Sequence, residues 1–238
     1  MAYPPAPAGR VLYAIGDVHG RSDALDLAFA RLDADRATLE GEEPIEIYVG
    51  DYIDRGPDSR GVVERLIRRA ETVDCVFLRG NHEATLIEAL GEDALFGDWL
   101  DMGAVPTILS YGVEPWMVQA GSQNAADLAR AFKALLPQSH FRFLGATHSW
   151  ARFGSYVFVH AGLKPGVPLE AQRPDDLFWI RSEFLKSNHD FGHIVVHGHT
   201  PVNAVDFRAN RINIDTGAYA TNRLTVLRID EAGPRVLD

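Results

Sequence analysis

The chain has 238 residues, 46% of them hydrophobic, which is long enough for one well-buried core, so we expect a single domain. Its 33 acidic residues outnumber its 23 basic ones, and the formal net charge of -10 disfavours nonspecific binding to nucleic acid or to an anionic membrane. A site for an anionic ligand would therefore need its own local positive charge.

Cysteine content and hydropathy indicate a cytoplasmic protein. The single cysteine, Cys75, has no partner for an internal disulfide and lies in an apolar run, where we expect a small core residue. No apolar run has the length needed to span a membrane, and residues 1–9, rich in Pro and Ala, lack the charged and then apolar order of an export signal. We expect residues 1–9 to form a flexible arm and residues 10–238 to form the domain.

Strands and helices alternate in the first third of the chain. Apolar runs at 10–15, 45–49 and 75–78 predict three buried strands, and helical spacing predicts a helix capped by Ser22 and a second one opened by residues 57–59. The residues expected to face the core from these helices are Leu25, Ala28, Phe29, Leu32, Val62, Val63, Leu66 and Ile67. This alternation favours parallel strand pairing with right-handed crossovers, and hence an α/β fold.

The middle of the chain has a different pattern. From Ala84 to about residue 140 the sequence reads as helical segments, including 85–90 and 125–136, which we interpret as a helical insertion beside the site. Strand character then returns at 147–153, 156–159, 194–196, 211–214 and 224–229. Several of these runs are too close together for helical crossovers, so we expect a second, mixed or antiparallel sheet packed on the first.

Three short segments end the first three predicted strands with polar side chains. They are Gly16-Asp17-Val18-His19-Gly20, Gly50-Asp51-Tyr52-Ile53-Asp54-Arg55-Gly56 and Gly80-Asn81-His82-Glu83. Because ligands collect at the carboxyl ends of strands in open α/β sheets, three such segments predict one shared site.

Two later strands end in the same manner, at His160 and His199. The complete set of oxygen and nitrogen donors is then Asp17, His19, Asp51, Asn81, His160 and His199. A set without sulfur suits Mn²⁺, Fe or Zn²⁺ at a catalytic site better than a structural zinc. Six protein ligands are too many for one catalytic ion, so we expect two divalent ions bridged by Asp51, with Mn²⁺ as the expected metal.

The order and spacing of these motifs resemble the metallophosphatases of the phosphoprotein phosphatase family, in its bacterial serine/threonine branch, within the calcineurin-like phosphoesterase superfamily. The resemblance covers five motifs between Gly16 and Thr200. It implies a central β-sandwich of two mixed sheets flanked by helices. It also implies that Asp17, His19 and Asp51 hold one ion, and that Asp51, Asn81, His160 and His199 surround the other.

The same resemblance implies a direct attack on phosphorus by a metal-bridging hydroxide. Two cations close together can activate water and stabilise both the attacking and the leaving oxygen. His82 is then expected to protonate the leaving group, with Asp54 orienting its imidazole. Arg55 and Arg181 are expected to bind the phosphate. An ion pair of Arg55 with Asp54 or Glu83, and a surface position for Arg181, remain as the structural alternatives.

The substrate is expected to be a phosphorylated protein or a small phosphoester, with phosphoserine and phosphothreonine first and phosphotyrosine as a further candidate. The alternative is hydrolysis of dinucleoside polyphosphates, as in the sister branch of the family. Asp54 and Glu83 follow the protein phosphatase pattern, which favours the monoesterase. A non-catalytic scaffold of the same fold is the third hypothesis, and it predicts a damaged ligand set, whereas all six ligands and His82 are present.

Overall fold

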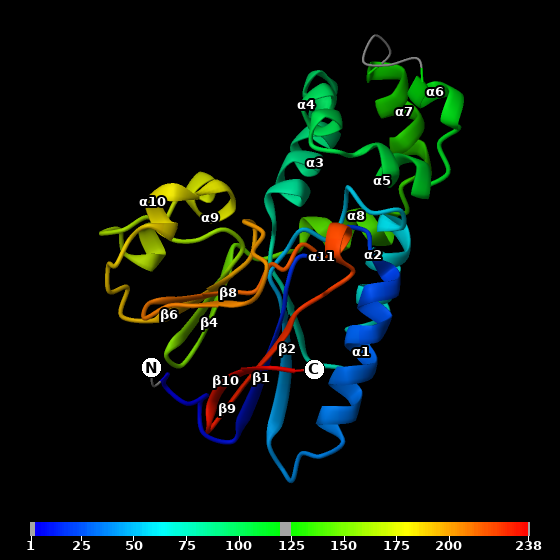
Figure 1. The fold of residues 1–238 in the computed structure, drawn as a ribbon. Coiled ribbons are helices and arrows are strands. Elements are labelled where there is room, and N and C mark those ends of the chain that lie inside the picture. Colours follow the sequence, from blue (N-terminus) through cyan, green and yellow to red (C-terminus); the bar gives the residue numbers. More distant parts are fainter. Residues whose placement is uncertain (1–2, 120–124, 238) are drawn as a thin grey trace.

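The computed structural model describes residues 3–119 and 125–237, drawn in colour in Figure 1. In this part of the chain, two five-stranded mixed sheets pack face to face, with helices on the outer side of each. The expected α/β class, with two mixed sheets flanked by helices, is therefore confirmed.

The first sheet has the strand order β10-β9-β1-β2-β3. Its strands are β1 (Arg10–Ile15), β2 (Glu43–Tyr48), β3 (Cys75–Phe77), β9 (Val226–Asp230) and β10 (Gly233–Val236). β1, β2 and β3 pair in parallel, as the alternation with helices predicts, and β9 adds antiparallel to β1. The expectation that the strand near 224–229 belongs to the second sheet is wrong, because its main chain pairs with the free edge of β1.

The second sheet has the order β4-β5-β6-β8-β7. Its strands are β4 (Trp150–Phe153), β5 (Tyr156–Val159), β6 (Ile194–His197), β7 (Asp206–Phe207) and β8 (Arg211–Asn213). β5, β6 and β8 run parallel to one another, whereas β4 and β7 pair antiparallel at the two edges. The short strands β7 and β10 carry no clear sequence signal and were not predicted.

Alternating side chains of β1 show how the layers are held together. Tyr13 and Ile15 face a core cluster shared with the helices, while Leu12 and Ala14 face a second cluster that includes residues of the other sheet, such as Phe158. Because successive side chains of a strand point to opposite faces, one apolar strand joins both layers. A third cluster fills the space between the second sheet and its outer helices.

Apart from one short helix near the site, the helices fall into three groups, which can be followed in Figure 1. α1 (Ser22–Arg36) and α2 (Ser59–Arg69) cover the first sheet, and α9 (Pro174–Trp179) and α10 (Ser182–Leu185) cover the second; α11 (Ala218–Thr221) lies near the site. The remaining helices are α3 (Asn81–Gly91), α4 (Phe96–Asp101), α5 (Val105–Ser110), α6 (Pro115–Gln119), α7 (Ala125–Leu135) and α8 (Gln138–Gly145), with short 3₁₀ turns at Asp93–Leu95 and Leu169–Ala171. They form the expected helical insertion; α4 to α7 project at the top of Figure 1, whereas α8 lies lower, against α2.

Two helix starts differ in how they are capped. The prediction that Ser22 caps α1 is wrong: Ser22 is the first residue of the helix, and its hydroxyl donates to the Asp58 carboxylate. Asp58 itself accepts from the backbone N–H of Gly61 and so caps α2. One carboxylate thus ties the starts of both helices together next to the first two motifs.

Residues 3–9 of the predicted arm contact both sheets. The Tyr3 hydroxyl donates to the carbonyl of Arg208, and the backbone N–H of Ala6 donates to the carbonyl of Asp230. Residues 1–2 lie outside the described part of the chain, so the flexibility of the arm stays a prediction.

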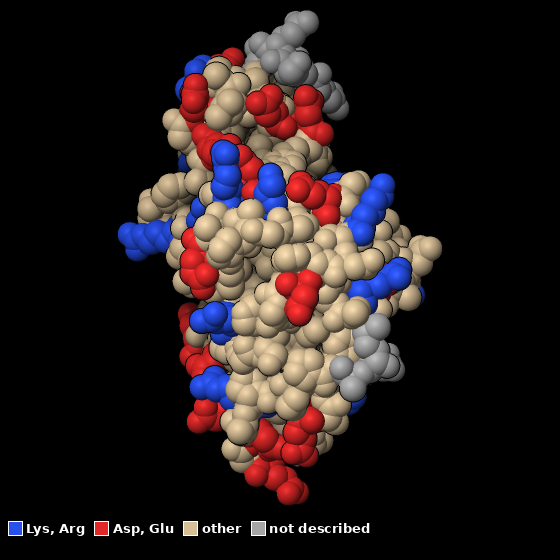
Figure 2. Space-filling model, turned by 90° about the vertical axis from the view of Figure 1, so that its left-hand side faces the viewer, with Lys and Arg blue, Asp and Glu red and all other residues tan. Residues whose placement is uncertain are grey.

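Most of the face shown in Figure 2 carries neither acidic nor basic side chains; acidic side chains gather on the insertion at the top and at the opposite end, with basic side chains scattered between them. This distribution agrees with the net charge of -10 and supplies no broad basic surface on that face. No helix among the described residues has both the length and the apolar character that a membrane crossing requires.

Candidate metal centre

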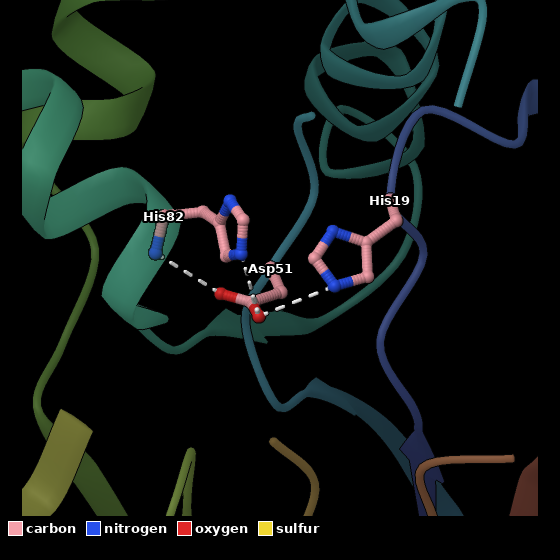
Figure 3. Close-up of side chains that lie close together, drawn as sticks. All are labelled: His19, Asp51 and His82. Atoms are coloured by element: carbon pink, nitrogen blue, oxygen red, sulfur yellow. Dashed lines mark hydrogen bonds and ion pairs between the residues drawn. The ribbon is translucent and has the colours of Figure 1, made fainter. Parts of the chain in front are cut away.

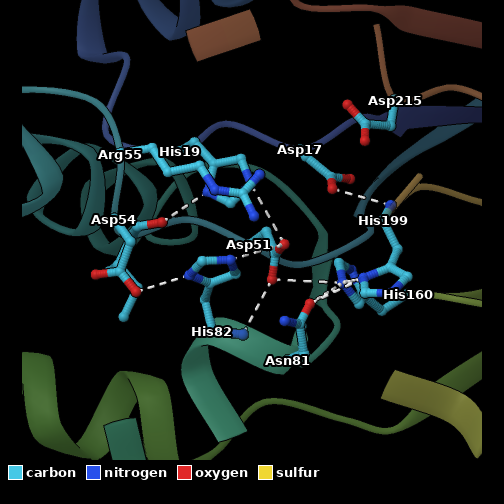
Figure 4. Close-up of polar contacts among 12 residues, drawn as sticks. Asp17, His19, Asp51, Asp54, Arg55, Asn81, His82, His160, His199 and Asp215 are labelled. Atoms are coloured by element: carbon cyan, nitrogen blue, oxygen red, sulfur yellow. Dashed lines mark hydrogen bonds and ion pairs between the residues drawn. The ribbon is translucent and has the colours of Figure 1, made fainter. Parts of the chain in front are cut away.

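All six predicted metal ligands come together at the carboxyl ends of strands from both sheets (Figure 4). The residues following β1, β2 and β3 in the first sheet, and β5 and β6 in the second, are Asp17, His19, Asp51, Asn81, His160 and His199. Each of them is at most 4% exposed. Buried polar side chains are costly unless their donors and acceptors are satisfied, so the contacts among them decide what the cluster can hold.

Asp51 lies at the middle of the cluster. Its Oδ2 is 3.4 Å from Nε2 of His19 and its Oδ1 is 3.4 Å from Nε2 of His160. It thereby belongs to two groups whose ligand atoms lie close enough to share an ion, one with His19 and His82 (Figure 3) and one with His160 and His199. Asp51 thus belongs to two sets of ligand atoms, each compact enough to hold one ion, and this is the position of a bridging ligand.

Backbone carbonyls fix the tautomers of two of these histidines. The Nδ1–H of His19 donates to the carbonyl of Ile53 and that of His160 donates to the carbonyl of Val49, both over 2.9 Å. Because burial lowers the pKa of His19 to about 3 and also lowers the pKa of His160, both rings are neutral and each Nε2 carries a lone pair. Metal-bound histidines characteristically donate their second ring nitrogen in this manner.

The lone pair of His19 faces Nη1 of Arg55 at 3.1 Å, whereas that of His160 points at another acceptor. Nε2 of His160 lies 2.9 Å from Oδ1 of Asn81, which also contacts Nδ1 of His199 at 3.0 Å. Burial lowers the pKa of His199 to about 2, so this imidazole is neutral as well. Two acceptors facing each other across 2.9 Å repel unless a cation or proton lies between them, and neutral imidazole, amide and carboxylate are the donors that divalent metals accept.

Asp17 has an unsatisfied oxygen. Its Oδ2 accepts from the backbone N–H of His199 over 2.9 Å, but its Oδ1 is buried without a hydrogen-bond partner. Burial and the nearby carboxylates of Asp215 and Asp51 raise the pKa of Asp17, and burial raises the pKa of Asp215 to about 6. A divalent cation would satisfy the free oxygen and offset this repulsion, so the residues present fit a metal site.

His82 and Asp54 form a separate pair beside the cluster. Nδ1 of His82 and Oδ2 of Asp54 are 2.7 Å apart, and both side chains are fully buried. Burial alone would lower the pKa of His82, but Asp51 and Asp54 raise it above its ordinary value. Nε2 of His82 has no hydrogen-bond partner and lies 3.9 Å from Oδ2 of Asp51, so a proton on that nitrogen would face the centre (Figure 3).

Residues 11–230 match the family profile described as calcineurin-like phosphoesterase. The chain belongs to the calcineurin-like phosphoesterase family. It is 28% identical to serine/threonine-protein phosphatase 1 of Salmonella typhimurium, with 92% of each chain covered. It is 25% identical to the asymmetrical bis(5'-nucleosyl)-tetraphosphatase PrpE of Anoxybacillus flavithermus, over 91% of this chain and 89% of that one.

Solved structures support the fold. A crystal structure described as a putative diadenosine tetraphosphatase superposes with a TM-score of 0.66 at 19% identity, covering 99% of this chain and 96% of that chain. At this identity the likeness concerns the fold alone. The family resemblance read from the five motifs is thus confirmed, and the relatives include both phosphatases and tetraphosphatases.

The two predicted phosphate-binding arginines lie on opposite sides of this phosphoesterase centre. Nη1 of Arg55 is 3.1 Å from Nε2 of His19, and its guanidinium carbon lies 5.0 Å from the centre of the Tyr219 ring. Nε of Arg181 donates to Nε2 of His199 over 3.0 Å. The alternative ion pair of Arg55 with Asp54 or Glu83 does not form among the described residues.

Several residues of the site were missed at the level of sequence. Asp215 follows an apolar run as the predicted metal ligands do, so its position after Ile214 was an available signal. Glu83 belongs to the third motif, but its function, to accept from the backbone N–H groups of Asp51, Tyr52 and Gly80, needs the folded chain. Tyr219 has no signal at all in the sequence.

Proposed function

We propose that this protein is a metal-dependent phosphomonoesterase that acts on phosphorylated proteins, phosphoserine and phosphothreonine first. The observation that carries the proposal is the position of Asp51 between two ligand groups, next to a histidine whose free nitrogen faces the same point. A centre of this kind can bind cations and donate a proton to the same phosphoester.

In this proposal the two ligand groups hold two divalent ions, with Mn²⁺ as the expected metal and Fe and Zn²⁺ as alternatives. Asp17, His19 and Asp51 would hold one ion, and Asp51, Asn81, His160 and His199 the other. Such a pair supplies Lewis acidity and lowers the pKa of water at the site. The chain's part is to fix the ligand geometry and to keep three neutral imidazoles available.

His82 is the proposed general acid. Asp54 holds Nδ1–H, so that the second ring nitrogen can carry a proton to the oxygen that leaves phosphorus. Although its Nε2 shares a group with His19 and Asp51, we assign it to proton donation because its hydrogen bond to a buried carboxylate favours the protonated ring.

Arg55 and Arg181 are proposed to bind the phosphate oxygens. Each guanidinium now lies against a neutral metal-ligand histidine, an arrangement that leaves its positive charge without a neutralising carboxylate among the described residues. A phosphate dianion between them would accept hydrogen bonds from both sides. In an acidic protein these two charges provide the local attraction for an anion.

Hydrolysis of dinucleoside polyphosphates is the second candidate function. It is favoured by the tetraphosphatase relative and by two exposed aromatic rings, Tyr219 and Trp179, which are 39% and 44% exposed. Their ring centres lie 5.5 Å from His19 and 6.3 Å from His199, respectively, on the two sides of the centre. Exposed rings there could stack on nucleobases.

The test compares wild type with His82→Ala on a phosphoserine peptide, a phosphotyrosine peptide and diadenosine tetraphosphate, each with Mn²⁺ and with a chelator. We expect metal-dependent turnover, highest on the phosphoserine peptide, and a loss of about 10²-fold or more in the variant with Mn²⁺ binding retained. His189→Ala, at an exposed position outside the motifs, serves as the control. Turnover that persists with chelator, or full activity of His82→Ala, contradicts the mechanism, and a preference for the tetraphosphate selects the second function.

A further inference from the structure

Three residues of the helical insertion hydrogen-bond to the loop that carries Asp54 and Arg55. Nε1 of Trp99, in α4, donates to Oδ2 of Asp54 over 2.9 Å. The hydroxyl of Thr107, in α5, donates to Oδ1 of Asp54 over 2.7 Å. Between them, the carbonyl of Gly103 accepts from the backbone N–H of Arg55 over 3.0 Å.

These bonds account for both oxygens of the Asp54 carboxylate. Oδ2 is shared between Trp99 and His82, and Oδ1 is held by Thr107, whose oxygen also accepts from the backbone N–H of Asp54 over 2.8 Å. Trp99, Thr107 and Asp54 are fully buried, so water does not compete for these contacts. The carboxylate therefore has one position, and the imidazole hydrogen-bonded to it takes its orientation from that position.

The backbone of this loop also depends on the insertion. Asp54 and Arg55 have φ angles of 71° and 67°, in the left-handed region that residues with a side chain rarely adopt. Such torsions cost free energy and persist only where surrounding contacts hold them. Ser59 accepts from the Asp54 N–H at 3.0 Å, and the N–H of Gly56 donates to the Asp54 carbonyl at 2.7 Å; the other backbone hydrogen bonds of this pair come from the insertion.

We propose that Trp99 and Thr107 are positioning residues for the general acid, and that the helical insertion serves the chemistry by fixing Asp54 and through it His82. The inference rests on the proposed function of His82. It assigns a role to a segment that carries no metal ligand beyond the first turn of α3. Loss of either donor would let the carboxylate rotate, and proton donation would weaken while the metal ligands stay in place.

The test uses two substrates that differ in their need for a proton. A serine alkoxide is a poor leaving group and requires general acid catalysis, whereas p-nitrophenolate leaves without a proton. For Thr107→Val and Trp99→Phe we expect kcat on a phosphoserine peptide to fall about 10-fold or more, and kcat on p-nitrophenyl phosphate to change less than about 3-fold, with Mn²⁺ affinity unchanged. Thr107→Ser, which keeps the hydroxyl, should restore the phosphoserine rate.

Trp116→Phe makes the matching change at a 67% exposed tryptophan of the insertion and should leave both rates unchanged. As a readout besides activity, the Nδ1–H proton resonance of His82 in metal-free protein should shift or broaden in Thr107→Val. Equal losses on both substrates in a folded variant, or no loss on either, would overturn the inference. Absence of phosphoserine turnover in wild type, or full turnover in His82→Ala, would instead overturn the proposed function itself.

Discussion

Individual backbone torsions mark the site as clearly as the side chains do. Five of the six non-glycine residues with positive φ among those described are His19, Asp51, Asp54, Arg55 and His199, with angles from 44° to 71°. Each such torsion costs of order 1–3 kcal/mol and is retained only where other contacts hold it. The fold therefore accepts strain at positions that aim the proposed metal ligands and phosphate-binding group, and the residue that orients the proposed proton donor, at one point.

The pH dependence of catalysis should respond to Asp54. Its charge and hydrogen bond raise the pKa of His82, so Asp54→Asn removes an interaction that favours the protonated ring. His82 then loses its proton at lower pH, and we expect the alkaline limb of kcat/KM to move to lower pH, with kcat reduced about 10-fold or more. The measurement is a pH–rate profile at saturating Mn²⁺, with Asp98→Asn, at an exposed carboxylate of the insertion, as the control. An alkaline limb that stays at the wild-type pH would remove Asp54 from this role.

At the scale of elements, the sequence predicts which segments are strands better than which strands are neighbours. β1, β2 and α2 have the types predicted, because apolar runs bounded by Gly, Pro or Asp report local structure. The run near 224–229 was recognised as a strand but given to the wrong sheet. Its neighbour is set by the unpaired edge of β1, a property of the assembled sheet that no local pattern reports.

The same distinction between local pattern and tertiary packing applies to the residues of the site. The motifs of the proposed metal ligands could be recognised because each lies directly after a strand, where chain order alone brings the side chain to the sheet edge. The contacts of Asp54 with Trp99 and Thr107 join residues 45 and 53 positions apart. These contacts form because the insertion folds back over the second motif. That arrangement depends on tertiary packing, which the spacing of residues in the sequence does not report.

The turn after β6 lies against the turn after β1, and a single added methyl group can test this contact. A Cβ placed on Gly198 would lie 1.9 Å from Oδ1 of Asp17, the oxygen without a hydrogen-bond partner. Gly198→Ala should push this carboxylate away and lower Mn²⁺ affinity by about 10–100-fold, the range seen when groups that orient metal ligands are changed. Calorimetric titration measures it. Gly145→Ala, where a Cβ meets nothing within 4 Å, is the matched control, and equal affinities in the two variants would contradict the placement of Asp17.

For the whole molecule, the centre lies where the two sheets meet. The first sheet supplies four of the six proposed ligands and the second supplies two, His160 and His199, while an apolar cluster holds the sheets together below them. Without cations, the neighbouring carboxylates Asp17, Asp51 and Asp215 repel one another, and burial penalises their charge. Ions bound there would therefore stabilise the packing of one sheet on the other as well as take part in the chemistry.

Removal of metal should accordingly lower thermal stability. An ion that binds only the folded chain adds about 2.7 kcal/mol at 100 times its dissociation constant, which corresponds to about 5–10 °C in Tm for a domain of this length. We expect a chelator to lower Tm by that order and Mn²⁺ to restore it. Asp51→Asn changes the carboxylate shared by both ligand groups, so its Tm should lose most of its response to Mn²⁺, whereas Asp98→Asn should respond as wild type does. If Tm of wild type is the same with chelator and with Mn²⁺, the ions do not link the sheets, and the centre would contribute to chemistry alone.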